Sequence, residues 1–481
     1  MERLRVSADG RRLETASGRP FFYLADTAWT LPQRLKWDDA RHFMQTRRAQ
    51  GFTALQIVAL DPERDVEMRD PAGNPALVDG DPARPNEAYF AYLDRVLDLA
   101  EEFGLYVLLL PVWGQLVVGA SWGGGTFPKT VTAQNAHGFG RWIGDRYRHR
   151  GNIIWCLGGD RQPIHDGVDY RDVWRRLAEG VAEGVTGQAC AWNVPSAAWE
   201  SVLMTYHACF EMETGEHSTM SYWTDEEAWI SFIVLQSGHG RHTASHVSLR
   251  AEHDRERTLP VLDAEPAYER MPMNWPQLFP LHGDWIVRMR AYWAVLGGAL
   301  GHTYGHASVW CSISERERNE VLDVTWFEAL SSPGAGQMTV LRHLAEALEA
   351  HRWRPAPSML AHESECSATC VDHHRQAALD RDREFAIVYL TDGGRERVDL
   401  SVLAGEAPLQ AVWFDPRLGT LHAEAFPVPR GEVVVDAPGQ GEGDDWLLVV
   451  TSREGDLARL AQRRSYGDRA EAERMSMVWA E

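Results

Sequence analysis

The stretch DDARHFMQTRRAQGFTALQIVAL, residues 38–60, predicts an amphipathic helix that ends at Gly51, followed by a strand that is apolar on both faces. A glycine after the last helical turn supplies the left-handed conformation that ends a helix. A strand without polar alternation is typical of a parallel sheet covered by helices. The same order recurs twice, because the predicted helices over 87–103 and 134–149 also end at a glycine before LYVLLLPVW and NIIWCLGGD. This repeat indicates βα architecture.

Working outward from this stretch, the chain up to about residue 306 contains eight candidate strands, and a last helix is predicted near 334–350. This number suits a (βα)8 TIM barrel better than an open sheet. A β-hairpin that turns at Asp9-Gly10 and Ser17-Gly18 precedes the first strand, so the predicted catalytic domain spans residues 1–352. The candidate strands are 22–29, 52–60, 105–113, 152–160, 202–208, 230–238, 259–266 and 299–306.

The texture changes after the proline-marked segment RWRPAPSM, residues 352–359. EFAIVYLTDGG, QAVWFDPRLGT, EVVVDAP and DWLLVVTS read as short alternating strands between turns. Residues 357–452 are therefore predicted to form a small antiparallel β-sandwich. The tail, residues 453–481, is charged and has a helical pattern, and the sequence does not place it.

The composition narrows the function classes. Against 48 Lys and Arg stand 69 Asp and Glu, and the net charge of -21 disfavours a nucleic acid or an anionic membrane as partner. The N-terminal residues lack the apolar core of an export signal and no apolar run is long enough for a membrane span, so we expect a cytoplasmic protein. The six cysteines are expected to be reduced. A homo-oligomer is possible.

Polar and aromatic side chains follow most of the predicted strands, where a (βα)8 barrel collects its functional groups. Aromatic rings stack on the faces of sugars, while carboxylates, amides and imidazoles bond to sugar hydroxyl groups. More than half of the 20 tryptophans are nevertheless expected to be core residues. The candidate sugar-binding residues are Asp26, Trp29, Trp113, Gln115, His207, Gln236, His239, Tyr304 and His306.

Two carboxylates, Asp160 and Glu265, end the fourth and seventh predicted strands. Glycoside hydrolysis needs one carboxylic acid to protonate the leaving oxygen and one carboxylate to attack or to activate water. Asp160 could instead cap a helix or pair with Arg161. Asp263 lies on the same side of its strand as Glu265, and we expect one of these two to bind an arginine. Each histidine could also be a core residue that is held by hydrogen bonds.

The phrases PFFYLADTAW, GFTALQIVAL, GLYVLLLPVWG, RGNIIWCLGGDR, LMTYHA, LQSGHG, VLDAEPAYE and GHTYGHASVW occur in one order. Together they resemble the apiosidase-like glycoside hydrolases (glycoside hydrolase family 140), in which a β-sandwich follows the catalytic barrel. The resemblance covers residues 4 to about 450. It implies a retaining hydrolase without a cofactor, in which Asp160 is the general acid/base and Glu265 the nucleophile.

The resemblance further implies that the enzyme removes apiose, or another small pentose or deoxyhexose. The expected cytoplasmic location favours a small glycoside or oligosaccharide as substrate. The long segments 117–128 and 209–223 are expected to close one end of the site, which predicts an exo-acting enzyme. CFEMETGEHSTMSYW and WCSISERERNE depart from the family pattern near the predicted substrate mouth, where the sugar is selected.

Two other function classes stay open. Histidines beside carboxylates at strand ends would suit a metal-dependent barrel hydrolase or isomerase, although no HxH or HExxH spacing is present. Intact Asp160 and Glu265 argue against a non-catalytic carbohydrate-binding protein. We assign no metal site, and the spacing of the sandwich candidates is not an established zinc pattern; they are His362, Cys366, Cys370, His373 and His374.

Overall fold

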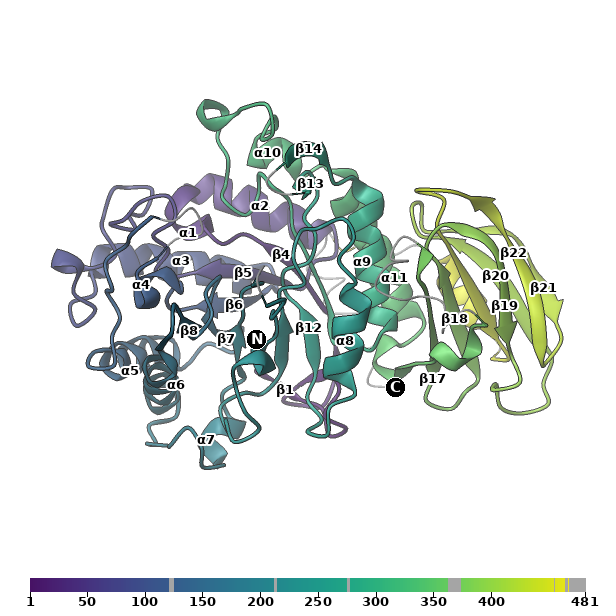
Figure 1. Ribbon diagram of the computed structural model, residues 1–481, viewed down its shortest axis with the longest axis horizontal. Coiled ribbons are helices and arrows are strands. Elements are labelled where there is room, and N and C mark those ends of the chain that lie inside the picture. Colours follow the sequence, from purple (N-terminus) through teal and green to yellow (C-terminus); the bar gives the residue numbers. More distant parts are fainter. Residues whose placement is uncertain are drawn as a thin grey trace.

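The computed structural model describes the chain except for residues 121–124, 212–213, 275–276, 362–372, 454, 463–465 and 467–481. An α/β barrel forms the N-terminal part, and an antiparallel β-sheet domain lies beside it (Figure 1). Helices α9 (Asp284–Leu296) and α11 (Pro333–Ala347) separate the two (Figure 1). No helix among the described residues is long and apolar enough to cross a membrane.

Six parallel strands form one curved sheet in the order β10-β7-β6-β5-β4-β15. A separate parallel pair, β11 (Ile233–Leu235) and β12 (Val261–Asp263), completes the set of predicted barrel strands. The six are β4 (Tyr23–Thr27), β5 (Ala54–Val58), β6 (Tyr106–Leu110), β7 (Ile153–Gly158), β10 (Met204–His207) and β15 (Gly301–Tyr304).

Hydrogen bonds link the pair to both edges of the large sheet. The Ser231 N–H donates to the Met204 carbonyl at 2.8 Å, and the Leu300 N–H donates to the Val261 carbonyl at 2.8 Å. Across the interior, the Gln56 side-chain amide donates to the carbonyl of Ala264 at 2.9 Å. An open sheet would not bring β5 and β12 face to face, so the strands enclose a common interior. Its core includes Tyr23, Ala25, Ala54, Val58, Leu108, Leu110, Ile154, Cys156, Val234 and Leu262.

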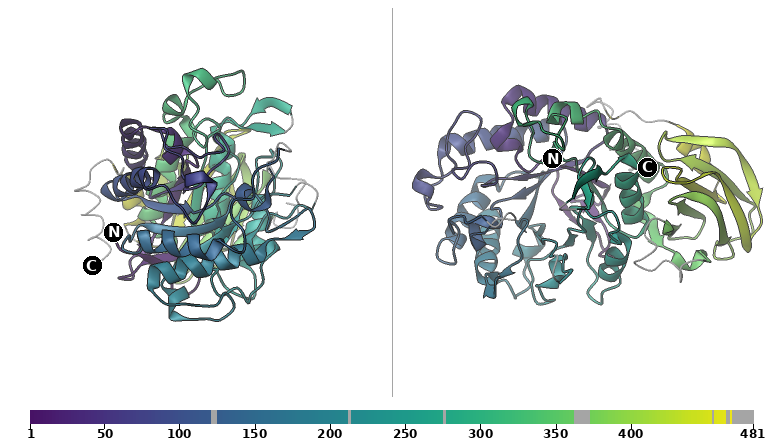
Figure 2. Two further views of the ribbon diagram at one scale, coloured as in Figure 1. Left: turned by 90° about the vertical axis from the view of Figure 1, so that its left-hand side faces the viewer. Right: turned by 45° about the horizontal axis from the view of Figure 1, so that its top comes forward.

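Helices surround these strands (Figure 2), and the four predicted ones are present. Besides α9 and α11, the helices of the N-terminal part are α1 (Leu31–Arg34), α2 (Trp37–Ala49), α3 (Glu87–Glu102), α4 (Gln115–Val118), α5 (Ala136–Tyr147), α6 (Arg171–Thr186), α7 (Ala197–Glu200), α8 (Ser245–His253) and α10 (Trp326–Ala329). The four predicted helices are α2, α3, α5 and α11. Gly51 and Gly104 take φ of 85° and 67°, so they end their helices in the left-handed conformation as expected. The prediction is wrong for Gly151, which has no positive φ and follows the end of α5 by four residues.

The step from β10 to β11 departs from strand–helix alternation. Its described residues contain only the short 3-10 turn η2 (Thr219–Ser221). Buried Trp223 and Trp229 pack edge to face at a centroid distance of 5.1 Å, and Trp223 also contacts Tyr206 of β10. Two large rings anchor this segment in the core, where an amphipathic helix would otherwise bury an apolar face.

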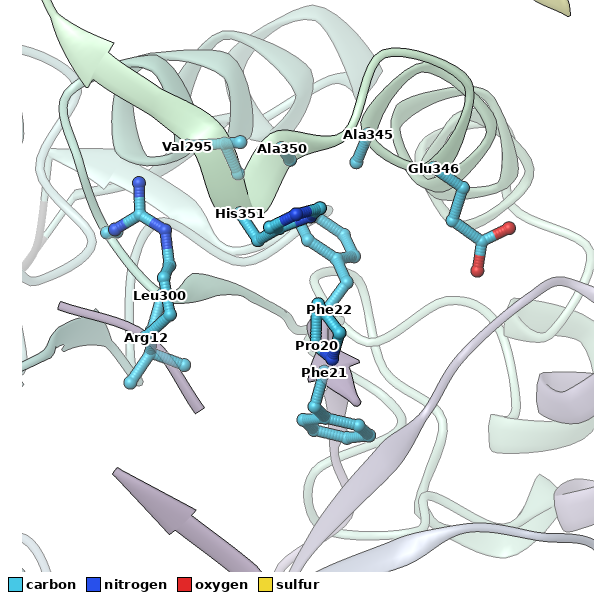
Figure 3. Close-up of a pocket in the computed structure, with 11 residues that line it drawn as sticks. Arg12, Pro20, Phe21, Phe22, Val295, Leu300, Ala345, Glu346, Ala350 and His351 are labelled. Atoms are coloured by element: carbon cyan, nitrogen blue, oxygen red, sulfur yellow. The ribbon is translucent and has the colours of Figure 1, made fainter. Parts of the chain in front are cut away.

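The N-terminal strands β1 (Leu4–Val6), β2 (Leu13–Thr15) and β3 (Pro20–Phe21) form the predicted antiparallel opening. Leu4 and Leu13 join the interior core of the barrel. A pocket nearby is lined by residues that precede β4 and β15, including Phe22 and Leu300, and by His351, which follows α11 (Figure 3). This pocket therefore lies at the N-terminal ends of the strands, whereas Asp160 and Glu265 follow the C-terminal ends.

The C-terminal domain contains a six-stranded antiparallel sheet and the antiparallel pair β19 (Gly393–Asp399) and β22 (Glu432–Gln440). A core between them matches the predicted β-sandwich. The sheet order is β16 (Trp353–Pro355), β17 (Arg375–Asp380), β18 (Phe385–Leu390), β23 (Trp446–Thr451), β20 (Leu409–Asp415) and β21 (Thr420–Val428), and α12 (Asp456–Ala461) follows.

Strands β18 and β23 are buried at every position, so the predicted alternation is wrong for them. Val388 and Leu448 face the core shared with β19 and β22, whereas Ile387 and Val449 belong to the core that contains α9 and α11. The sheet is covered on both faces, because the barrel helices pack on the face that an isolated sandwich would expose to water.

Polar contacts also join the two parts. Arg288 of α9 is fully buried and donates to both carboxylate oxygens of Asp445, at 2.9 and 2.5 Å. The Tyr389 hydroxyl donates to the same carboxylate at 2.8 Å. Because a buried charge needs its partner, this pair ties the C-terminal domain to α9.

Candidate active site

The fourth predicted strand delivers Asp160 through a turn of three left-handed residues. Gly158, the last residue of β7, and the following Gly159 and Asp160 have φ of 83°, 99° and 55°. A Cβ on Gly159 would lie 2.4 Å from the ring of Trp113, and one on Gly158 would lie 2.5 Å from the carbonyl of His207. The two glycines therefore allow the backbone to approach these neighbours closely, which suits a short acid such as aspartate.

Glu265, just past β12, lies between two imidazoles. Its carboxylate oxygens are 3.3 Å from His207 Nε2 and 3.4 Å from His239 Nε2. Burial alone would raise the pKa of Glu265, but His207 and His239 outweigh burial and hold this pKa well below its usual range. Glu265 is therefore a buried carboxylate that stays ionised at neutral pH.

Asp160 has an oriented amide as its partner. The Gln236 side chain donates from Nε2 to Asp160 Oδ1 at 3.0 Å, while its carbonyl oxygen accepts from the Phe210 N–H. The backbone bond fixes which end of the amide faces Asp160. The guanidinium of Arg161 is 3.5 Å from Asp160 Oδ2, which agrees with the alternative prediction that Asp160 pairs with Arg161. No helix begins at Asp160.

Two tryptophans line the same end of the barrel. The rings of Trp29 and Trp113 lie 5.3 Å apart, and Trp29 packs edge to face on His207 at 5.4 Å. His239 contacts the ring of Tyr268 at 4.5 Å. The structure thus brings Trp29, Trp113, His207, Gln236 and His239 together with the two carboxylates, and aromatic rings beside imidazoles and carboxylates can bind a sugar.

Asp26 and Tyr304 form a second, separate cluster. Arg47 of α2 donates to Asp26 at 2.5 Å and lies over the Tyr304 ring, whose hydroxyl donates to Glu269 at 2.7 Å. Asp26 and Arg47 are fully buried. The chemistry of this group is that of an internal ion pair, so the structure explains Asp26 and Tyr304 without a ligand.

Two further predicted groups also have structural partners. His306 is buried and its Nδ1 accepts from the Ser308 N–H at 3.0 Å, and burial lowers the pKa of His306 to about 3. Asp263 accepts from the Ser237 hydroxyl at 2.7 Å, where we had expected Asp263 or Glu265 to bind an arginine.

The structure adds acidic groups that sequence reasoning missed. Asp61 and Glu63 follow β5, and Gln115 donates its side-chain amide to Glu63. Burial, with contributions from Glu63 and Asp160, raises the pKa of Asp61 to about 7. Burial also raises the pKa of the Cys209 thiol well above its usual range, and the nearby charges of Asp160 and Glu265 act in the same direction. The position of DPE after a predicted strand was the available signal for Asp61 and Glu63.

Among the described residues, the group spaced closely enough to hold a metal ion is Asp380, Asp382 and Glu384 in the C-terminal domain. Arg352 forms ion pairs with Asp380 and Asp382, so the positive charge beside these carboxylates already comes from the protein. Of the zinc candidates from the sequence, His362, Cys366 and Cys370 lie outside the described residues. His373 and His374 are paired with Asp392 and Gln376.

An α/β barrel whose strand ends gather two carboxylates, imidazoles and tryptophans is typical of the glycoside hydrolases. Residues 7–352 match the model of the apiosidase-like catalytic domain, and the chain belongs to this family. Residues 355–451 match a second model, described as "Putative collagen-binding domain of a collagenase". The protein is a glycoside hydrolase, as the sequence motifs predicted.

Solved structures share this fold. A glycoside hydrolase family 5 protein from Bacteroides vulgatus aligns with a TM-score of 0.80 and 24% identity, over 96% of this chain and 95% of its own. A structure titled "Glycoside hydrolase" gives 0.79 and 24%, over 97% and 98%. No curated protein matches the chain in sequence. At these identities the structures establish the fold, and the substrate needs separate evidence.

Proposed function

We propose that the protein is a retaining glycoside hydrolase with Glu265 as the nucleophile and Asp160 as the general acid/base. The observation that carries this assignment is the contrast between the two carboxyl groups. Glu265 is buried between His207 and His239, which keep it ionised. Asp160 receives a neutral amide donor on one oxygen and follows another strand of the barrel. A hydrolase needs such a pair, with one carboxylate to attack and one group to exchange a proton.

The reaction then runs in two steps. Glu265 attacks the anomeric carbon while Asp160 protonates the leaving glycosidic oxygen, which gives a covalent glycosyl-enzyme and a free alcohol. Asp160, now a carboxylate, takes a proton from water as that water attacks the anomeric carbon and releases Glu265. The hydrogen bond from Gln236 orients the Asp160 carboxyl group for this proton transfer.

The eight barrel strands, in this proposal, form a complete (βα)8 barrel within residues 1–352. The links from Met204 to Ser231 and from Val261 to Leu300 support its closure. Residues 357–452 are the second domain and residues 453–481 a tail. The buried contacts of α9 with Asp445 and Tyr389 support a role for the second domain in holding the barrel helices.

The substrate in this proposal is a small glycoside or oligosaccharide with a terminal apiose, or another small pentose or deoxyhexose. Membership of the apiosidase-like family supports this class. Exo action would follow if the segments 117–128 and 209–223 close one end of the site. Residues 121–124 and 212–213 of these segments lie outside the described residues.

A panel of p-nitrophenyl glycosides tests the proposal: apioside, arabinosides, xyloside, fucoside and rhamnoside. At least one should be hydrolysed, and proton NMR of the first product should show the anomeric configuration of the substrate. Inversion would require a water between the carboxyl groups and would overturn the nucleophile assignment. Loss of hydrolysis on chelation, with recovery on addition of a divalent metal, would favour a metal-dependent hydrolase.

Glu265→Gln should abolish hydrolysis of every glycoside in the panel, because the neutral amide cannot form the glycosyl-enzyme. The matched control is Glu67→Gln, the same exchange at an exposed residue of the β5–α3 loop. Retained hydrolysis in Glu265→Gln, or an equal loss in the control, would contradict the assigned role.

A further inference from the structure

Glu63 lies near Asp160, the proposed acid, and has no role in the proposed mechanism. It follows β5, and its N–H donates to the Asp61 carboxylate at 2.8 Å. The side-chain amide of Gln115 donates to Glu63 Oε1. Asp61 and Gln115 are buried, whereas Glu63 is only partly buried. Asp61 and Gln115 therefore fix the position of Glu63, and part of the Glu63 side chain stays accessible to solvent.

Trp113 supplies a donor without an acceptor. Its side chain is 3% exposed, and its indole N–H has no hydrogen-bond partner among the described residues. The indole lies beside the Glu63 carboxyl group and lowers the pKa of that group, but the two do not meet with the geometry of a direct hydrogen bond. An unpaired buried donor is costly, and in a binding site it indicates a ligand that completes it.

The charges around Glu63 favour a donor from the ligand. Burial raises the pKa of Glu63, and the nearby charge of Asp160 raises it further; Arg161, Trp113 and Gln115 lower this pKa without cancelling the rise. A hydrogen bond donated to the carboxylate would offset this cost. A neutral hydroxyl group can donate to Glu63 and accept from Trp113 at once, whereas an anion would be repelled by Glu63 and Asp160.

We propose that Glu63 and Trp113 together bind one hydroxyl group of the sugar, which accepts from the indole N–H and donates to the carboxylate. The inference rests on the proposed function and adds a determinant of its specificity. Trp113 also contacts Trp29 and lies 6.4 Å from the His207 ring, beside Glu265. The bound hydroxyl therefore belongs to the sugar whose anomeric carbon Glu265 attacks.

The test uses the p-nitrophenyl glycoside that the wild-type enzyme hydrolyses fastest, and its monodeoxy forms. One deoxy form should lose about 10- to 100-fold in kcat/KM, which is the range for a hydrogen bond to a charged group. Glu63→Ala should cause a similar loss on the parent glycoside and little further loss on that deoxy form. Trp113→Phe keeps an aromatic ring but removes the indole N–H, and it should weaken discrimination at the same hydroxyl. Glu67→Gln should change neither rate.

The possible results separate the two proposals. A wild-type enzyme that hydrolyses no glycoside overturns the proposed function and this inference with it. A hydrolysing enzyme in which Glu63→Ala slows the parent and every deoxy form equally overturns the inference alone. An equal loss accompanied by a shifted pH–rate profile would show that Glu63 acts through Asp160. Circular dichroism of each variant shows whether it is folded.

Discussion

At the scale of single residues, the face of the strand on which a side chain lies determines its role. Tyr23 and Ala25 point into the barrel core, while Leu24 joins the core that contains α9 and α11. Asp26 lies on the same outward face of the strand as Leu24 and accepts a hydrogen bond from Arg47 of α2. Glu265 lies past the end of its strand and meets His207 and His239. Two carboxylates near strand ends thus have different chemistry.

Removal of the acid should depend on the leaving group. Asp160→Ala should slow hydrolysis of alkyl glycosides by orders of magnitude and that of activated aryl glycosides far less, because a good phenol leaves without protonation. Azide should restore turnover of the aryl substrate and give a glycosyl azide of retained configuration. The control is Asp166→Asn at an exposed aspartate six residues away. Equal losses on good and poor leaving groups would contradict the acid role.

Gln236 should act as a positioning residue. Gln236→Leu removes the donor to Asp160 Oδ1, so kcat/KM on alkyl glycosides should fall about 5- to 20-fold, as expected for one lost hydrogen bond. Activated aryl glycosides should lose far less, because Gln236 positions the acid and a good phenol leaves without protonation. A role limited to packing would slow both substrates equally, and Gln188→Leu at an exposed glutamine should slow neither.

At the scale of elements, the turn after β7 combines strain with close contact. Gly159 has a positive φ and contacts the Trp113 ring, whereas Gly167 has φ of 74° with open space around it. Asp160, which follows Gly159, is itself in the left-handed region. The Gly-Gly pair therefore ties the position of the acid to the position of Trp113.

Alanine at these glycines should separate strain from steric clash. Gly167→Ala pays only the backbone cost, about 1 kcal/mol of unfolding free energy. Gly159→Ala also forces Trp113 to move, so the loss should reach roughly 2–4 kcal/mol, with a drop in kcat. Urea unfolding and kinetics of both variants measure this difference. Equal losses in the two variants would mean that the contact with Trp113 does not matter.

The strands and the main helices were predictable because glycine stops and apolar runs are local signals. The face on which each strand residue lies was not, since parallel strands are apolar on both sides and Asp26 gives no sign of its outward direction. Glu63 was missed because it belongs to a charged run, DPERD, that reads as a loop. The described residues between β10 and β11 form no α-helix, which was not foreseen, because Trp223 and Trp229 bury that segment through long-range contacts.

At the scale of the whole molecule, buried contacts join the barrel to the C-terminal domain, and several titratable side chains lie in this interface. The Arg288–Asp445 pair and the Trp293 indole, which donates to Thr391 at 3.0 Å, lie between α9 and the C-terminal sheet. His246 and His374 stack there at a centroid distance of 3.6 Å. A proton on either ring would place a charge in this interface, so the junction depends on neutral histidines.

Acid should therefore destabilise the fold before most carboxylates protonate. Burial lowers the pKa of several histidines, to about 2 in His246, about 3 in His302 and His306, and about 4 in His282, His351 and His374. The unfolded chain binds these protons near pH 6.5 and the folded chain does not, so stability is full above 6.5 and falls as the pH drops toward 4. Asp61, whose pKa burial raises to about 7, opposes this trend by a single proton.

The measurement is the free energy of unfolding between pH 8 and 5. It should fall by about 1 kcal/mol or more per pH unit below 6.5 for each histidine that stays neutral in the fold. His246→Phe keeps a ring stacked on His374 and removes one such group. Its free energy of unfolding should therefore depend less steeply on pH, by the amount that one proton contributes. His149→Phe, at an exposed histidine, should leave this slope unchanged. Stability that stays level from pH 8 to 5, or an identical slope in His246→Phe and wild type, would show that the interface tolerates the charged rings.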